Sequence, residues 1–175
     1  MASPPDPTPI VVIMGVTGSG KSTLAALLAA RTGGTFLDAD DFHPPENIAK
    51  MRRGLPLDDA DRAGWLATLA AILHSHPPSA PPLFLACSAL KHAYRDSLQA
   101  ANPARISFAF LNAPPELIRN RLQQRHTAGS HFMPPALLDS QLATLEPPTG
   151  AITLDASLPP ALLADQLLAK LTIPY

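Results

Sequence analysis

The residues with the clearest chemical pattern are 15-GVTGSGKS-22, which match G-x-x-x-x-G-K-[ST]. Glycines at 15, 18 and 20 let backbone amides turn inward around a phosphate. Lys21 is expected to reach the β- and γ-phosphates of a nucleoside triphosphate, and the Ser22 hydroxyl to ligate Mg²⁺. The predicted phosphate-binding set is Gly15, Val16, Thr17, Gly18, Ser19, Gly20, Lys21, Ser22 and Thr23.

The context of this loop favours a phosphate site over a glycine-rich turn that binds nothing. An apolar β-branched run, 10–14, precedes it, and an Ala- and Leu-rich segment, 21–33, follows as a predicted helix whose start adds a positive dipole end. The chain has no N-K-x-D guanine signal, and the apolar run 83–87 leads into 86-ACSALK-91 rather than the Asp of an ATPase. A small kinase fits better than a GTPase or a motor.

Three aspartates follow the predicted second strand, 35–39, close to the phosphate loop in a parallel sheet. Alternation along a strand would point Asp38 and Asp40 to opposite sides. One could then hold water on Mg²⁺, and the other could accept a proton from an attacking hydroxyl. An Asx-turn or helix-cap cluster is the alternative for both, and it is the preferred interpretation of Asp41.

Basic residues follow the second and third predicted strands, which places them around the expected acceptor cleft. They are Lys50, Arg52, Arg53, Lys91 and Arg95. This grouping favours an anionic acceptor whose carboxylate is held by Lys or Arg. A solvated basic face is the alternative for each residue taken alone.

The elements that must position these residues alternate between strand and helix. Further predicted strands are 105–111 and 151–156, and further predicted helices are 47–53, 58–75, 91–101, 115–125, 135–146 and 160–171. Such alternation predicts an α/β fold with a five-stranded parallel sheet flanked by helices on both faces. Residues 10–175 are expected to form a single domain after a disordered lead-in at 1–9.

Composition narrows the class of partner and compartment. The formal net charge is −1, which gives no overall attraction to nucleic acid or to anionic membranes. A single cysteine, Cys87, fits a reducing cytoplasm, and no apolar run reaches the length of a membrane helix. A cytoplasmic enzyme for a small molecule is therefore expected, with no nucleic-acid or membrane partner.

Most of the chain resembles the bacterial gluconokinases, which are P-loop kinases similar in fold to shikimate kinases. The matching stretches are 14-MGVTGSGKS-22, 36-FLDADDFHPPENIAKMRRGLPLDDADR-62 with Trp65, 87-CSALKHAYRD-96 and 131-HFMPPALLDSQLATLEPP-148. The resemblance implies transfer of the ATP γ-phosphoryl to the 6-hydroxyl of D-gluconate, with Mg²⁺, and a homodimer. Kinases of a related sugar acid or shikimate-like acceptor, and a nucleotide-sensing module, are the alternatives.

Residue roles follow from this resemblance. Asp40 is the expected acceptor-site carboxylate and base, and Asp38 lies nearer the metal. The substrate-facing set implied is Asp40, His43, Lys50, Arg53, Lys91 and Arg95. For His43 the alternative is an imidazole that stabilises a turn, and Trp65 is expected in the core rather than in contact with the ligand.

A helical lid is expected over about 121–135. Arg121 and Arg125 lie four residues apart on one predicted helix, where like charges repel unless an anion lies between them. Both are expected to hold ATP phosphates, with Arg125 neutralising charge during transfer; a solvated basic face is the alternative. The tip 126-HTAGSHF-132 contains an apparent insertion of about three residues relative to the family.

Overall fold

The computed structural model describes residues 7–127 and 137–171, with residues 125–127 described by their backbone alone. Within this part, Thr8 lies against the loop at 76–82, and its hydroxyl donates hydrogen bonds to the carbonyls of Pro78 and Ala80. Thr8, which falls in the expected lead-in at 1–9, is therefore held by the fold, and residues 1–6 of that lead-in lie outside the described residues.

The centre of the molecule is a five-stranded sheet with strand order β2-β3-β1-β4-β5. Its strands are β1 (Ile10–Met14), β2 (Thr35–Asp38), β3 (Leu83–Ala86), β4 (Ile106–Asn112) and β5 (Ile152–Asp155). Every neighbouring pair is parallel. The predicted parallel sheet is confirmed, and its carboxyl ends meet at one edge, where ligands of α/β proteins bind.

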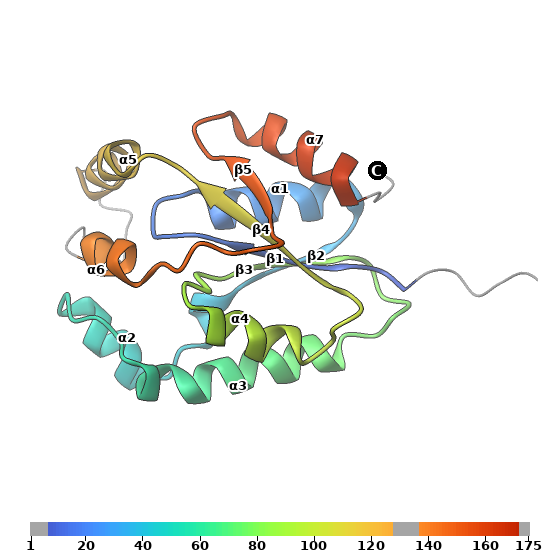
Figure 1. Ribbon diagram of the computed structural model, residues 1–175, viewed down its shortest axis with the longest axis horizontal. Helices are drawn as coiled ribbons and strands as arrows, with labels where there is room; N and C mark the ends of the chain where they lie inside the picture. Colours follow the sequence, from blue (N-terminus) through green and yellow to red (C-terminus); the bar gives the residue numbers. More distant parts are fainter. Residues whose placement is uncertain (1–6, 128–136, 172–175) are drawn as a thin grey trace, which may run out of the picture.

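Helices cover both faces of the sheet (Figure 1). On one face α1 (Lys21–Thr32) and α7 (Pro160–Leu171) pack over Val11 and Ile13 of β1. On the other, α3 (Asp59–Ser75) and α4 (His92–Gln99) pack over the alternate residues of β1. All five residues of β1 are fully buried, so this strand has an apolar environment on both sides, as a central parallel strand requires.

Four further elements gather beyond the carboxyl edge of the sheet. They are the 3₁₀ helix η1 (Ala39–Phe42) and the helices α2 (Pro45–Arg52), α5 (Pro115–Thr127) and α6 (Leu137–Thr144). Figure 1 shows α2, α5 and α6 together at one end of the molecule. Val16 of the phosphate loop packs in a small apolar cluster with Ile118 and Leu122 of α5 and Leu138 of α6. These elements therefore surround the predicted site.

The observed elements fall close to the predicted ones, with one difference that matters. The second strand ends at Asp38, and η1 begins at Ala39 because the Asp38 side chain accepts a hydrogen bond from the amide of Asp40. Asp40 is therefore on a 3₁₀ turn and not on the strand, so strand alternation was the wrong basis for separating it from Asp38. None of the helices in the described ranges is long and apolar enough to cross a membrane.

Candidate active site

The phosphate loop joins β1 to α1 and has backbone angles that only glycine accommodates easily. Gly15 has φ +145°, and a Cβ there would lie 2.9 Å from the carbonyl oxygen of Leu111. Gly18 has φ +77°, and its Cβ would meet the Leu122 side chain of α5 at 3.0 Å. A side chain at either position would push the loop away from β4 or α5, and the cradle for phosphate would change shape.

Lys21, at the start of α1, folds back over this loop. Its Nζ donates a hydrogen bond of 3.0 Å to the carbonyl of Val16. The helix N-cap is Gly20, whose lack of a side chain leaves the first turn without a side-chain cap. Together these features leave an ammonium group and the positive end of a helix dipole at one place, which is the chemistry that binds a triphosphate.

A magnesium ion fits the oxygen atoms beside this loop. The Ser22 hydroxyl donates a 2.6 Å hydrogen bond to Oδ2 of Asp38, so a hydroxyl and a carboxylate already lie at one point. Mg²⁺ is commonly held by one or two protein oxygens, with phosphates and water completing its shell. Among the described residues, no group of three or more His, Cys, Asp or Glu side chains forms a separate metal site.

Asp40 lies within electrostatic reach of the phosphate loop. Burial among protein atoms raises the pKa of its carboxyl above the usual 3.8, Lys21 opposes this rise, and the charges of Asp38 and Asp41 add to it. The side chain nevertheless keeps 50% of its surface exposed, so it stays accessible to a hydroxyl group from solvent. A half-exposed carboxylate close to Lys21 can accept a proton from a bound hydroxyl.

His43 forms the wall beside Asp40. Its ring is stacked on Trp65, with centroids 4.3 Å apart and planes 13° from parallel, and its Nε2 lies 3.8 Å from Oδ1 of Asp40. The Asn47 amide nitrogen Nδ2 donates to the carbonyl of Asp61 at 2.8 Å and lies 3.5 Å from His43 Nδ1. Because Nδ2 can only donate, its position favours the His43 tautomer with hydrogen on Nε2. Burial lowers the pKa of His43 to about 4, and Arg62 adds to this effect.

Trp65 is 2% exposed, and its indole nitrogen donates to the carbonyl of Ala39 at 2.7 Å. The structure thus places Trp65 in the core beneath the site, as predicted. By fixing the first residue of η1 and the ring of His43, Trp65 also supports the position of Asp40.

Two of the predicted acceptor-side cations lie against the start of α3. Lys50 is 2.5 Å from Oδ2 of Asp61 and 3.6 Å from Asp58, and Lys91 is 2.7 Å from Oδ1 of Asp59. Both lysines have a raised pKa, caused first by the side-chain hydrogen bond to the partner aspartate. The structure therefore brings Lys50 and Lys91 to one helix terminus and keeps both charged.

The two predicted arginines on this side are placed differently from each other. Arg53 ends α2, is exposed, and donates from Nε to the carbonyl of Ala49 at 3.3 Å. Arg95 is only 5% exposed, and its Nη1 donates to the carbonyls of Ala89 and Leu90 at 2.9 and 3.0 Å. Arg95 is therefore not accessible to a substrate here. It holds the turn before α4, where Ala89 has a φ of +43°.

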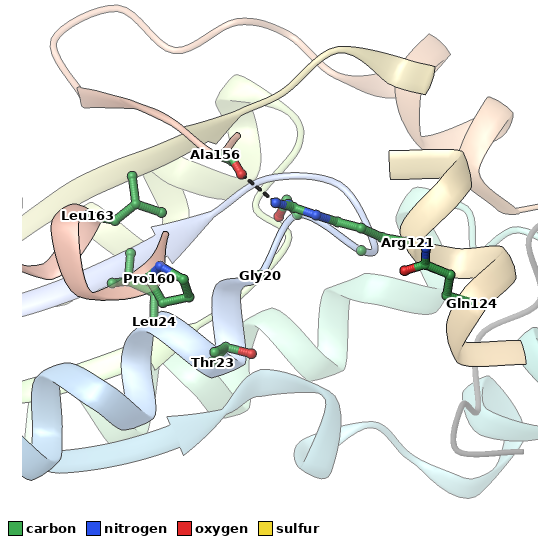
Figure 2. Close-up of a pocket in the computed structure, with 10 residues that line it drawn as sticks. Gly20, Thr23, Leu24, Arg121, Gln124, Ala156, Pro160 and Leu163 are labelled. Carbon is green, nitrogen blue, oxygen red and sulfur yellow. Dashed lines mark hydrogen bonds between the residues drawn. The ribbon is translucent and has the colours of Figure 1, made fainter. Parts of the chain in front are cut away.

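A cavity of about 410 Å³ lies on the other side of the phosphate loop, between α1, α5 and the turn after β5. Figure 2 shows Arg121 reaching from α5 across this cavity, where its Nη2 donates to the carbonyl of Ala156 at 2.8 Å. Leu24, Pro160 and Leu163 provide apolar walls. Size, apolar walls and continuity with Gly18 and Gly20 suit the base of a nucleotide.

Much of the predicted lid lies outside the described residues. These leave out the Arg125 side chain and residues 128–136, which include most of the tip 126–132 with its apparent insertion. Arg121 lines the cavity beside Gly18, but its guanidinium is bonded to Ala156 and not directed by any described contact toward a phosphate. The role of both arginines at the phosphates stays a prediction.

Several residues of the site were missed by sequence reasoning. Asn47 is 2% exposed and joins His43 to α3. Asp59 accepts hydrogen bonds from both Lys91 and Tyr94. Gln141 of α6 accepts a hydrogen bond from the phosphate loop. Asp58, Asp59 and Asp61 lie at the start of α3, where the helix dipole also favours their negative charge. Only the HPPEN stretch carried a usable signal for one of these residues, because its prolines predict a turn that brings Asn47, at the start of α2, back to His43 before the helix.

The sheet order, the glycine-rich loop with Lys21 and Ser22, and the cavity beside it define a P-loop kinase. A family model described as an AAA domain matches residues 10–148. A probable gluconokinase of Mus musculus is 43% identical over 86% of this chain and 91% of that protein. A gluconokinase of Gluconobacter oxydans is 45% identical over 79% of this chain and 75% of that protein.

Structural comparison agrees with the sequence matches. The crystal structure of a gluconokinase from Sinorhizobium meliloti superposes with a TM-score of 0.82 at 41% identity, covering 95% of this chain and 92% of that one. The chain belongs to the gluconokinase family of P-loop kinases. The family resemblance inferred from the sequence motifs is confirmed.

Proposed function

We propose that the protein transfers the γ-phosphoryl group of ATP to the 6-hydroxyl of D-gluconate, giving 6-phosphogluconate and ADP. The observation that carries this proposal is the position of Asp40. Its carboxyl lies close enough to Lys21 for the lysine charge to oppose the rise in its pKa that burial causes. A proton acceptor next to a phosphate loop serves a kinase with a hydroxyl acceptor, whereas a nucleotide sensor needs none. Membership of the gluconokinase family supports gluconate as that acceptor.

The chain's own residues divide the reaction between them. Amides of the phosphate loop and Lys21 bind the phosphates, and Ser22 with Asp38 would hold Mg²⁺, which neutralises charge on the phosphates when bound. Asp40 accepts the proton of the attacking hydroxyl. Neutral His43 keeps its Nε2 toward Asp40 and limits the directions from which a hydroxyl can approach.

The acceptor carboxylate is best matched to the cations at the start of α3. Two lysines are held there by aspartates of the first turn of α3. Lys91 lies 2.7 Å from Asp59, and Lys50 lies 2.5 Å from Asp61. Arg53 is exposed at the end of α2 and able to join them. Arg95 is left out of this set because it is buried against backbone carbonyls.

A coupled ADP-release assay over gluconate, related sugar acids, shikimate and nucleosides tests the proposal. Gluconate should accelerate ADP release most, and 6-phosphogluconate dehydrogenase should then oxidise the product, which identifies the phosphorylated hydroxyl. The Lys21→Ala variant, without the loop ammonium, serves as the inactive control. Absence of acceleration by gluconate, or a stronger response to another acid, would refute gluconate as the substrate.

The homodimer and the cytoplasmic location remain predictions. Light scattering on the purified chain tests whether it is a dimer.

A further inference from the structure

The phosphate loop is tied to a distant helix at a position that none of the assigned roles explains. The amide of Thr17, the third residue of the loop, donates a 2.6 Å hydrogen bond to Oε1 of Gln141 on α6. The two residues are 124 positions apart in the chain. Thr17 is 6% exposed, so its amide has little access to water and depends on a protein partner.

Helix α6 is held firmly enough to fix this contact. Leu138 packs in the cluster that contains Val16, the residue before Thr17, while Leu137 packs with Met51 and Leu57. Gln141 follows these leucines by three and four residues, so it lies on the same side of α6 and reaches the loop from a packed surface. Figure 1 shows α6 next to α5 at this end of the molecule.

A second polar tether follows Gln141 along the chain. The amide of Glu146 donates to the carbonyl of Leu90 at 2.9 Å, and its carboxylate accepts from the amide of His92 at 2.6 Å. The segment from Gln141 to Glu146 thus bonds to the phosphate loop at one end and to the turn that carries Lys91 at the other. Its position fixes the spacing between the phosphate side and the acceptor side of the site.

We propose that Gln141 is a positioning residue for the phosphate loop: it holds Thr17 so that the loop keeps its phosphate-binding shape before the nucleotide arrives. This inference rests on the proposed function only in assuming that the loop binds a nucleotide. Without the acceptor oxygen, the Thr17 amide must find another partner, and loop conformations that do so compete with the binding-competent one. The apparent dissociation constant rises as the competent fraction falls.

The Gln141→Met variant removes the acceptor oxygen at nearly constant side-chain size. We expect it to weaken binding of ADP with Mg²⁺, measured by calorimetry, by roughly 5- to 10-fold, the effect of losing one hydrogen bond. The KM for ATP should rise in parallel, while the KM for gluconate should change by less than about twofold, since no acceptor contact is lost. Thr144→Val is the matched control, because the one partner of the Thr144 hydroxyl among the described residues is the carbonyl of Ser140 in the same helix.

Amide hydrogen exchange followed by NMR gives a readout that does not depend on turnover. In the nucleotide-free wild-type protein the Thr17 amide should be protected, and Gln141→Met should remove that protection while Thr144→Val leaves it. An unprotected Thr17 amide in the wild type, or unchanged ADP affinity in a folded Gln141→Met variant, would overturn the proposal. If ADP binding responds as expected but gluconate is no substrate, the proposed function fails and the role of Gln141 stands.

Discussion

Replacing Asp40 by Asn tests the central assignment of the site, because it keeps the size of the side chain and removes its capacity to accept a proton. A positioned general base contributes about 10²- to 10⁴-fold to the rate, so kcat should fall by that factor. Binding of ADP should not weaken. Asp40 lies close to Lys21, and its negative charge repels the phosphates that Lys21 attracts, so affinity should stay equal or increase slightly.

The pH dependence has a definite sign. Burial, together with Asp38 and Asp41, raises the pKa of Asp40 above 3.8, against the opposing effect of Lys21. In the wild type, kcat/KM should therefore fall as the pH drops through a pKa higher than 3.8, and this acid limb should disappear from the residual activity of Asp40→Asn. A raised carboxyl pKa means that ionised Asp40 costs stability above that pKa, so Asp40→Asn should leave the Tm unchanged or slightly higher.

Asp41→Asn is the matched control for both measurements. Asp41 is the exposed neighbour on the same 3₁₀ turn, and its neutralisation should change kcat by less than a few-fold. Steady-state kinetics at saturating ATP and gluconate, with ADP affinity from calorimetry, separates the two effects. Near-wild-type kcat in Asp40→Asn, or an equal loss in Asp41→Asn, would refute the assignment of Asp40 as the base.

Three further predictions follow from the walls of the site. The pKa of His43 is about 4 in the folded protein and 6.5 in the unfolded chain, so the free energy of unfolding should fall by roughly 2–4 kcal/mol as the pH drops from 6.5 toward 4. Urea unfolding of the His43→Gln variant should not show this loss. Trp65→Phe leaves the Ala39 carbonyl without its donor and should cost about 1–3 kcal/mol in urea unfolding. Lys91→Met should raise the KM for gluconate by about tenfold and leave ADP affinity unchanged in calorimetry.

The sequence was sufficient for the elements and for the phosphate side of the site. A loop of fixed spacing between a strand and a helix places Gly15, Lys21 and Ser22 by local geometry alone, and the structure places them so. The strands and helices follow from apolar periodicity and from Pro and Gly boundaries, which are also local. Only the 3₁₀ turn at Asp40 was missed, because its cap depends on one side-chain hydrogen bond from Asp38.

The acceptor side could not be predicted to the same depth, because its residues are positioned by contacts between distant segments. Arg95 and Lys91 are four residues apart and looked equivalent as cations. The structure buries Arg95 under the turn at Ala89 and leaves Lys91 at the surface against Asp59. Gln141 lies in a stretch that matches the family, but nothing in the sequence indicated its role, since its bond is to an amide 124 positions away.

The same limitation changes the electrostatic interpretation of the acceptor side. In the sequence alone, the basic residues around the acceptor site indicate a strongly positive cleft. In the structure Lys50 faces Asp58 and Asp61, and Lys91 faces Asp59, so these two lysines meet three carboxylates. Under the role proposed for Lys91, an acidic acceptor competes with Asp59 for it, and the exchange of one carboxylate for another yields little net free energy. We therefore expect selectivity for a sugar acid to depend on hydrogen bonds to its hydroxyl groups, for which the α3 carboxylates are suitable acceptors.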